Sequence, residues 1–186
     1  MVLVFAGILI AEARHHGLDA PCYFGNPQAV CLAPNDTGKM DQDALDFIAR
    51  HRAAHLATAD IEGQPSVVPI CYVVDRENIY SAIDQKPKSV PAGSLKRLRN
   101  IEKNPRVSLV VDDYSEDWNK LAYCLVTGTA SILWPDGNSG VEHARAVAML
   151  RDKYSQYLRM AIETTPMVKI SPLRIKMWRF QKQPAK

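Results

Sequence analysis

Three stretches of the chain carry apolar residues at the spacing of an amphipathic helix, and they are separated by runs typical of β-strands. The helical stretches are residues 41–52, 94–105 and 140–157. An aspartate, Asp41 or Asp43, offers an N-cap for the first. The third helix is expected to face the core through a stripe of four residues, Val141, Ala144, Val147 and Leu150.

Six runs are predicted as strands: residues 54–60, 66–75, 79–84, 106–114, 121–133 and 167–180. Short turns join the first three, so they are expected to form an antiparallel meander. Pro69 indicates a bulge or an edge position, Gly128 a bulge, and Pro172 a break in the last strand. Because strands and helices do not strictly alternate, we predict an α+β fold, mainly β, with a six-stranded antiparallel barrel and helices packed outside it.

The composition is that of a globular domain. The chain has 186 residues, 47% of them hydrophobic, which suffices for one domain with a substantial core. Its net charge of +3 is small, and no helix-turn-helix, zinc finger or interleaved aromatic and basic pattern is present, so no nucleic-acid partner is expected.

The domain is predicted to begin at Met40. The apolar run at residues 1–11 is too short to span a bilayer and has no Lys or Arg before it, as a secretory signal would. We therefore expect no membrane association. Residues 1–39 are interpreted as a poorly ordered or non-native extension, and residues 40–186 as the cofactor-binding domain.

The cysteines and histidines form no standard metal or disulfide pattern. Four cysteines in a chain of this length do not make a disulfide scaffold, which favours a reducing, cytoplasmic location. His51 and His55 are four residues apart, but the second falls in a predicted strand, so both are interpreted as structural. We predict no metal site, and no nucleophile–base or paired-carboxylate arrangement identifies a catalytic residue.

The segment "AIDQKPKS", residues 82–89, places two lysines around a proline just after a predicted strand. Pro87 restrains the spacing of Lys86 and Lys88, Ser89 adds a hydroxyl, and a helix begins shortly afterwards. Together these groups suit a dianionic phosphate. A solvated connecting loop is the alternative interpretation.

Three blocks in this order resemble the flavin-binding split-barrel family of pyridoxamine phosphate oxidase: "HLATAD" with "GQPSVVP", then "IYSAID" with "KPK", then "LKRLRNIEKNPRVSLVVDDY" with "DW". The pattern is most similar to the branch of deazaflavin-dependent (coenzyme F420-dependent) enzymes, and it covers roughly residues 41–180. The resemblance implies a homodimer of split β-barrels with cofactor sites at the subunit interface.

The resemblance also implies a set of cofactor-binding residues. Lys86 and Lys88, with Ser89, would hold the cofactor phosphate. The ring would lie along the second and third strands, and the remaining residues would complete the phosphate end and the part of the site from the partner subunit. These ring and flanking residues are Val67, Val68, Pro69, Ser81, Ala82, Arg99, Asn100, Trp118 and Tyr123. Trp118 and Tyr123 are equally interpretable as aromatic residues of the dimer core.

The resemblance implies an oxidoreductase that transfers a hydride between coenzyme F420 and a small organic substrate. FMN shares the ribityl phosphate and is the alternative cofactor, as in a pyridoxamine phosphate oxidase-like oxidase or reductase. The basic residues of the second predicted helix would suit the acidic tail of the deazaflavin, but they are somewhat more typical of a solvated helix face, so the preference for coenzyme F420 rests on the resemblance. A non-catalytic flavin- or haem-binding protein is a further alternative.

Overall fold

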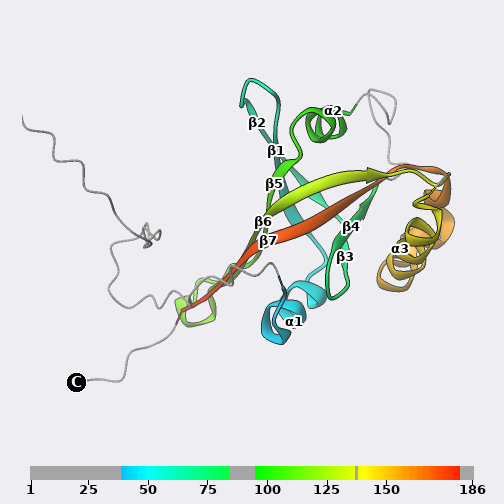
Figure 1. Ribbon diagram of the computed structural model, residues 1–186. Helices are drawn as coiled ribbons and strands as arrows, with labels where there is room; N and C mark the ends of the chain where they lie inside the picture. The colour runs from blue at the N-terminus through cyan, green and yellow to red at the C-terminus, as the bar shows by residue number, and fades with distance from the viewer. Residues whose placement is uncertain (1–38, 84–94, 137, 181–186) are drawn as a thin grey trace, which may run out of the picture.

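The computed structural model describes residues 39–83, 95–136 and 138–180, which form an antiparallel sheet with helices around it (Figure 1). The helices are α1 (Gln42–Arg50), α2 (Lys96–Lys103) and α3 (Gly140–Lys153), with short 3-10 turns η2 (Trp118–Lys120), η3 (Ser155–Arg159) and η4 (Ile162–Thr164). The strands are β1 (Ala54–Ala59), β2 (Pro65–Ile70), β3 (Val73–Val74), β4 (Ile79–Ala82), β5 (Arg106–Asp113), β6 (Ala122–Leu133) and β7 (Met167–Arg179).

Helix α1 begins where the sequence predicts. Asp41 is its N-cap, and a side-chain oxygen of Asp41 accepts a hydrogen bond of 2.8 Å from the main-chain N–H of Ala44. Ile48 is buried as expected, together with Ala44 and Phe47. The helix thereby closes one end of the barrel.

The described sheet has seven strands in the order β2-β1-β5-β6-β7-β4-β3, all antiparallel where they pair. The prediction of an α+β, mainly β fold is confirmed, with seven strands instead of six. The additional strand arises because the run at residues 66–75 divides into β2 and β3, which lie at opposite ends of the strand order. The predicted meander is therefore wrong: β1–β2 and β3–β4 are separate hairpins.

The division of this run makes the sheet curl. Ile70 and Val73 are three residues apart, a distance of about 10 Å at most, yet they end strands on opposite edges of the sheet. The two edges must therefore approach each other at Cys71 and Tyr72. This is the split in the barrel.

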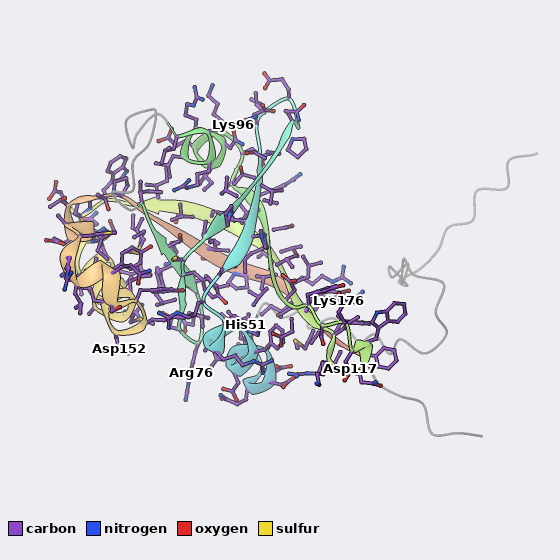
Figure 2. The ribbon with its side chains drawn as sticks, turned by 180° about the vertical axis from the view of Figure 1, so that it is seen from behind. His51, Arg76, Lys96, Asp117, Asp152 and Lys176 are labelled. Atoms are coloured by element: carbon purple, nitrogen blue, oxygen red, sulfur yellow. The ribbon has the colours of Figure 1, made fainter. Side chains whose placement is uncertain are left out.

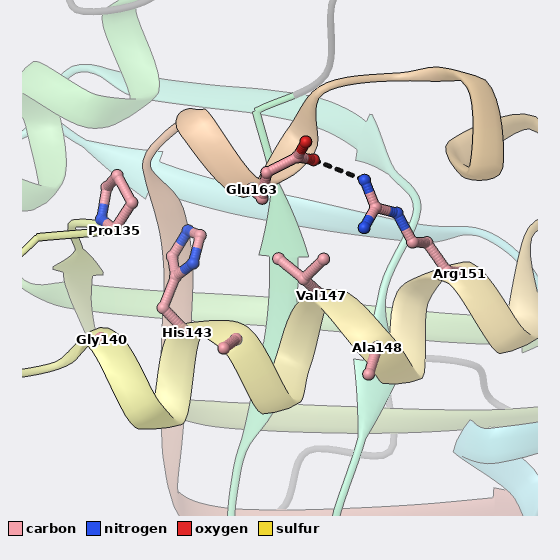
Figure 3. Close-up of a pocket in the computed structure, with 8 residues that line it drawn as sticks. Pro135, Gly140, His143, Val147, Ala148, Arg151 and Glu163 are labelled. Atoms are coloured by element: carbon pink, nitrogen blue, oxygen red, sulfur yellow. Dashed lines mark hydrogen bonds and ion pairs between the residues drawn. The ribbon is translucent and has the colours of Figure 1, made fainter.

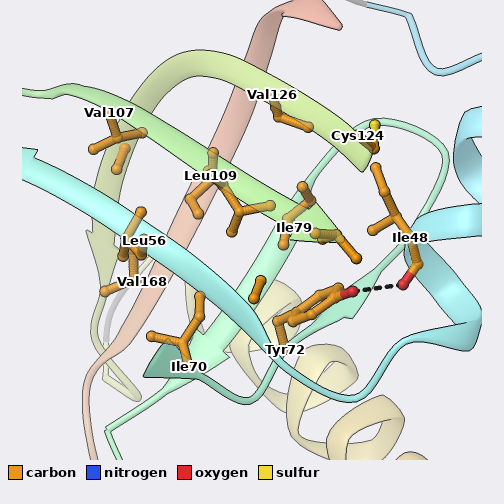
Figure 4. Packing of buried hydrophobic residues seen from close by; sticks show 14 of the residues in the cluster. Ile48, Leu56, Ile70, Tyr72, Ile79, Val107, Leu109, Cys124, Val126 and Val168 are labelled. Carbon is orange, nitrogen blue, oxygen red and sulfur yellow. Dashed lines mark hydrogen bonds between the residues drawn. The ribbon is translucent and has the colours of Figure 1, made fainter. Parts of the chain in front are cut away.

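Tyr72 is held at the split by a tyrosine from α3. The hydroxyl of Tyr154 accepts from the main-chain N–H of Tyr72 at 3.0 Å and lies 2.8 Å from its carbonyl oxygen. The Tyr72 hydroxyl donates to the carbonyl of Ile48 in α1 at 2.6 Å (Figure 4). The main-chain bonds that a continuous strand would give Tyr72 are thus replaced by side-chain bonds.

The long β6–β7 ladder contains one irregularity, between Thr127 and Gly128. A Cβ on Gly128 would lie 2.2 Å from the carbonyl oxygen of Ser171, so only glycine fits there. Gly128 pairs with Pro172, and β7 continues through this proline. The bulge at Gly128 is confirmed, whereas the break predicted at Pro172 is wrong because the bulge absorbs the missing N–H.

Two apolar clusters stabilise the fold. The larger fills the barrel, with residues of α1, α2 and most strands around Leu56 and Leu109 (Figure 4). The smaller lies under α3 and includes Val147 and Leu150. The predicted α3 stripe is only partly right: Val141 is 88% exposed and Ala144 is exposed, while His143 and Ala146 face the core.

Within the described residues, the helices are all too short or too polar to cross a membrane.

Candidate functional site

Strand β2 presents an unpaired, apolar edge. The main-chain N–H of Asp60 donates to the carbonyl of Gln64, which fixes the alternation of the β1–β2 ladder. In an antiparallel ladder, every second residue bonds to the neighbouring strand, and the residues between them direct their main-chain groups outward. Val68 bonds to Leu56 of β1, so the main-chain groups of Val67 and Pro69 point away from β1. The side chains of Val67 and Pro69 are also exposed, Val67 to 60%.

Strand β4 has a similar free edge beyond the end of β3. The N–H of Ile83 donates to the carbonyl of Pro166, and Ser81, two residues earlier, therefore also bonds to β7. Ala82 lies between them, so its N–H and C=O point away from β7. The β3–β4 ladder reaches only Tyr80, which leaves Ala82 without a ladder partner among the described residues. The side chains of Ser81 and Ala82 are buried, so only main-chain groups are available here.

These two free edges flank the split. Pro69 precedes the bend at Cys71 and Tyr72, and Ala82 lies just past the residue that pairs with Val73. Pro69 and Ala82 therefore both lie close to the bend, and Val67 precedes Pro69 by two residues on the same strand. A flat ring there would meet main-chain donors and acceptors together with apolar side chains.

Three of the predicted phosphate ligands, Lys86, Lys88 and Ser89, lie outside the described residues. Their role remains a prediction. They belong to the segment that connects Ile83, next to the free edge of β4, with Leu95, which precedes α2.

Helix α2 carries the two remaining residues predicted for the phosphate end. Arg99 is exposed. Asn100 is 4% exposed and its side-chain amide donates to the Thr58 hydroxyl at 3.0 Å, which links α2 to β1. Leu95 provides no side-chain cap for the N–H groups of the first turn. Asn100 thus has a packing role, and the helix N-terminus near the split lacks a side-chain acceptor.

Trp118 and Tyr123 lie at the opposite end of the sheet from α2. Tyr123 pairs with Asp112 near the end of β5, whereas α2 adjoins the beginning of that strand. Figure 2 shows Lys96 of α2 at one end and Asp117, next to Trp118, at the other. The eight residues of β5 span about 25 Å. Within one protomer, these two aromatics are therefore separated from α2 by about the length of β5.

Several aromatic side chains at this end of the sheet are exposed or partly exposed. Tyr123 stacks on Trp178 with ring centroids 5.4 Å apart, and Trp118 is 62% exposed. Tyr114, on the same loop as Trp118, is 76% exposed.

A charged group that the sequence did not single out joins α1 to β5. Asp113 accepts from His51 at 2.7 Å and from Arg50 at 2.9 Å. These hydrogen bonds, the one from His51 above all, hold the pKa of Asp113 below its ordinary value. His51 also contacts the carbonyl of Phe47 at 2.6 Å, as expected of a structural histidine.

A cavity of about 380 Å³ lies between α3 and the turn η4 (Figure 3). It is lined by residues that already bond to each other or to the main chain. His143 contacts the carbonyl of Thr165 at 2.9 Å, and Arg151 pairs with Glu163. Among the residues predicted to bind a cofactor, those that the structure describes do not line it, so the free edges at the split remain the better candidate site.

Solved structures with the same fold are known. A conserved hypothetical protein of Mycobacterium tuberculosis has a TM-score of 0.61 and 20% identity, covering 87% of this chain and 94% of its own. An FAD-binding protein of Mesorhizobium loti has a TM-score of 0.58 and 17% identity, covering 83% and 99%. HutZ, the haem storage protein of Vibrio cholerae, has a TM-score of 0.56 and 16% identity, covering 72% and 90%. At these identities the likeness shows the fold alone.

Two matches in sequence give information beyond the fold. The 5a,11a-dehydrotetracycline/5a,11a-dehydrooxytetracycline reductase of Streptomyces rimosus is 28% identical over 103 residues, which are 55% of this chain and 70% of the reductase. The family model described as pyridoxamine 5'-phosphate oxidase matches residues 40–179, nearly all of the part that the structure describes. The chain therefore belongs to the flavin-binding pyridoxamine 5'-phosphate oxidase family.

Proposed function

We propose that the protein is an oxidoreductase that binds the deazaflavin coenzyme F420 and transfers a hydride between it and a small organic substrate. Family membership supports a flavin-type cofactor, and the similarity to a reductase supports redox chemistry. The observation that carries the proposal is the pair of free main-chain edges on either side of the split, one on β2 with exposed Val67 and Pro69 and one on β4 at Ala82.

This region suits a planar tricyclic ring. Main-chain N–H and C=O groups of Val67 and Ala82 match the donors and acceptors on the ring edge, and the side chains of Val67 and Pro69 supply apolar contact. Because these groups sit on strands, they are held in place before binding, which lowers the entropic cost of orienting a ligand.

The charged end of the cofactor would lie toward α2. Lys86, Lys88 and Ser89 precede this helix in the chain and are proposed to hold the phosphate. The exposed basic residues of α2, Lys96, Arg99 and Lys103, would favour the acidic tail that distinguishes the deazaflavin from FMN.

The active form is proposed to be a homodimer with two sites. Within one protomer, Trp118 and Tyr123 lie at the end of the sheet away from α2, toward which the charged end of the cofactor is proposed to lie. A second protomer that places its exposed aromatic side chains over the split would complete the site and keep water from the ring.

The bound cofactor supplies the hydride chemistry, and the chain supplies placement. Val67 and Ala82 orient the ring, the lysines neutralise the phosphate, and the partner aromatics shape the space for substrate. Rate enhancement comes mainly from this orientation.

Native mass spectrometry with added coenzyme tests the proposal. We expect a species of two protomers with two cofactor molecules. Val67→Asp places a carboxylate on the ring surface without disturbing the core and should weaken binding at least about ten-fold, a loss of roughly 1.4 kcal/mol. Val141→Asp changes another exposed valine and should leave binding unchanged. Unaltered affinity of the Val67→Asp variant, or binding by monomer alone, would refute the proposal.

A non-catalytic haem-binding function is the second candidate, because HutZ shares the fold. The absorption spectrum separates the two. A Soret band with stoichiometric haem, and no binding of coenzyme F420 or FMN, would favour haem binding over redox catalysis.

A further inference from the structure

A buried amine without a hydrogen-bond acceptor lies at the end of α3, outside the proposed cofactor site. Lys153 is the last residue of α3, and its Nζ has less than 1 Å² of exposed surface and no hydrogen-bond partner in the described structure. Its nearest partners are aromatic faces: Nζ lies 4.3 Å from the ring centroid of Tyr72 and 5.6 Å from that of Tyr154. Rings alone stabilise a buried ammonium poorly, so this environment favours the uncharged amine.

Burial and a neighbouring positive charge both lower the pKa of this amine. Burial first, and then the nearby Arg52 guanidinium, lower the pKa of Lys153 to about 8, while Cys71 acts weakly the other way. Arg52 is fixed there by donating to the main-chain carbonyl of Lys153 at 2.6 Å. The neighbouring carboxylate, Asp152, is exposed. About a tenth of Lys153 is therefore uncharged at pH 7, far more than of an ordinary lysine.

A cavity with four apolar residues among its six lies next to Lys153. It measures about 300 Å³ and lies between α1, β3 and α3, lined by Ala49, Val73, Val74, Met149, Asp152 and Lys153. Figure 1 shows β3 between the two helices. The cavity has room for a molecule of a few carbon atoms, and its apolar walls match a short alkyl chain.

We propose that Lys153 is a reactive lysine that forms an imine with a small aliphatic aldehyde held in this cavity. The flexible stem of lysine lets Nζ leave the Tyr72 ring for the cavity. The nitrogen lone pair attacks the carbonyl carbon, giving a carbinolamine. Loss of the carbonyl oxygen and two protons as water then forms the C=N bond, with no change in oxidation state and no second reactant.

The test uses the wild-type protein as its own control. Propionaldehyde is added at low concentration with cyanoborohydride at pH 7, which converts each imine to a stable N-propyl amine. Peptide mass mapping then gives the rate at each lysine. We expect Lys153 to react about ten-fold faster than the exposed Lys96 and Lys120, because more of its amine is uncharged. Reaction at Lys153 no faster than at these lysines would overturn the proposal.

A second measurement tests the cavity without changing the lysine. Ala49 is exposed and lines the cavity, so Ala49→Trp should fill it and reduce labelling of Lys153 at least about five-fold, as expected when access to a buried nucleophile is lost. Ala144→Trp introduces the same ring on the exposed face of α3 and should change nothing. If Lys153 in the folded Ala49→Trp variant reacts as fast as in the wild type, the cavity does not admit the aldehyde and the proposal fails.

Discussion

The hydroxyl of Tyr154 lies within 3.0 Å of both the main-chain nitrogen and the main-chain oxygen of Tyr72, 82 residues away in the sequence. It also lies 2.8 Å from the carbonyl oxygen of Arg52. One side chain thus supports the bend that separates β2 from β3 and opens the barrel next to the candidate site. Burial raises the pKa of Tyr154 to about 12, so the hydroxyl stays protonated at neutral pH.

Removing that hydroxyl should destabilise the fold. Tyr154→Phe leaves the buried main-chain groups of Tyr72 without partners, so we expect a loss of about 1–3 kcal/mol in the free energy of unfolding, measured by urea denaturation. The exposed Tyr114 provides the matched control, and Tyr114→Phe should change stability by less than about 0.5 kcal/mol. Equal stability of the Tyr154→Phe variant and wild type would show that the bend does not depend on this contact.

The bulge in β6 should tolerate no side chain. Gly128→Ala puts a methyl group 2.2 Å from the Ser171 carbonyl oxygen, and backbone must move to relieve the clash. We expect a loss of about 3 kcal/mol or more, or failure to fold. Gly63 has a φ of 84° but open space around it, so Gly63→Ala should cost only about 1 kcal/mol. Thermal unfolding of the two variants gives the comparison, and a smaller loss for Gly128→Ala than for Gly63→Ala would contradict the register described.

The Asp113 contacts should make stability depend on pH in the acidic range. The pKa of Asp113 is lower in the folded chain than in the unfolded chain, so its contribution is complete above the ordinary carboxylate pKa and is lost as pH falls through the lowered value. Because Asp113 is partly exposed, Asp113→Asn should cost only about 0.5–1 kcal/mol at pH 7.

Denaturation at pH 7 and pH 2.5 checks this dependence. The difference between wild type and Asp113→Asn should be present at pH 7 and greatly reduced at pH 2.5. The exposed Asp136 is the control, and Asp136→Asn should match wild type at both values. A difference that is the same at both pH values would show that ionisation of Asp113 is not involved.

Burial of Lys153 should lower the free energy of unfolding at neutral pH, and this loss should disappear at alkaline pH. Its pKa falls from 10.5 in the unfolded chain to about 8 in the folded chain, so burial of the charged form is unfavourable below pH 8 and this cost disappears as pH rises toward 10.5. Lys153→Met keeps an unbranched apolar side chain and should raise the free energy of unfolding by about 1–3 kcal/mol at pH 7.

The gain from Lys153→Met should shrink at pH 10, where the wild-type amine is neutral in the folded state. Guanidinium denaturation at the two pH values measures it. A Lys153→Met variant that is less stable than wild type at pH 7 would mean that the contact with the Tyr72 ring outweighs the cost of burial.

Local features of the fold were predictable from the sequence. The cap at Asp41, the bulge at Gly128 and the edge position of Pro69 depend on nearby residues and were all confirmed. The division of residues 66–75 was not predictable, because the partner that replaces the ladder bonds is Tyr154, far away in the sequence. The predicted core-facing stripe of α3 was partly wrong because small apolar residues lie on two faces of this helix. The sequence also did not indicate that His143 faces the core, where it contacts the carbonyl of Thr165.

The candidate site was predictable only in part. Resemblance predicted Val67, Pro69 and Ala82 as ring-binding residues, and that role stays a prediction; the ladder alternation shows that their main-chain groups are open while those of Val68 and Ser81 are paired. The cofactor role predicted for Asn100 stays a prediction; the structure adds a hydrogen bond from its amide to Thr58, a contact that no local pattern reveals. The proposed role of Trp118 and Tyr123 involves a second subunit and stays a prediction.

Titration of coenzyme F420 and FMN into variants of the two loop lysines tests the central claim most directly. The double variant Lys86→Ala with Lys88→Ala should lose about 3–5 kcal/mol of binding free energy for both cofactors, since each lysine is proposed to make a charge-assisted contact with the phosphate. The double variant Arg76→Ala with Arg159→Ala removes the same charge from exposed positions elsewhere and should bind as wild type does. Unchanged affinity of the lysine variant for both cofactors would contradict the account.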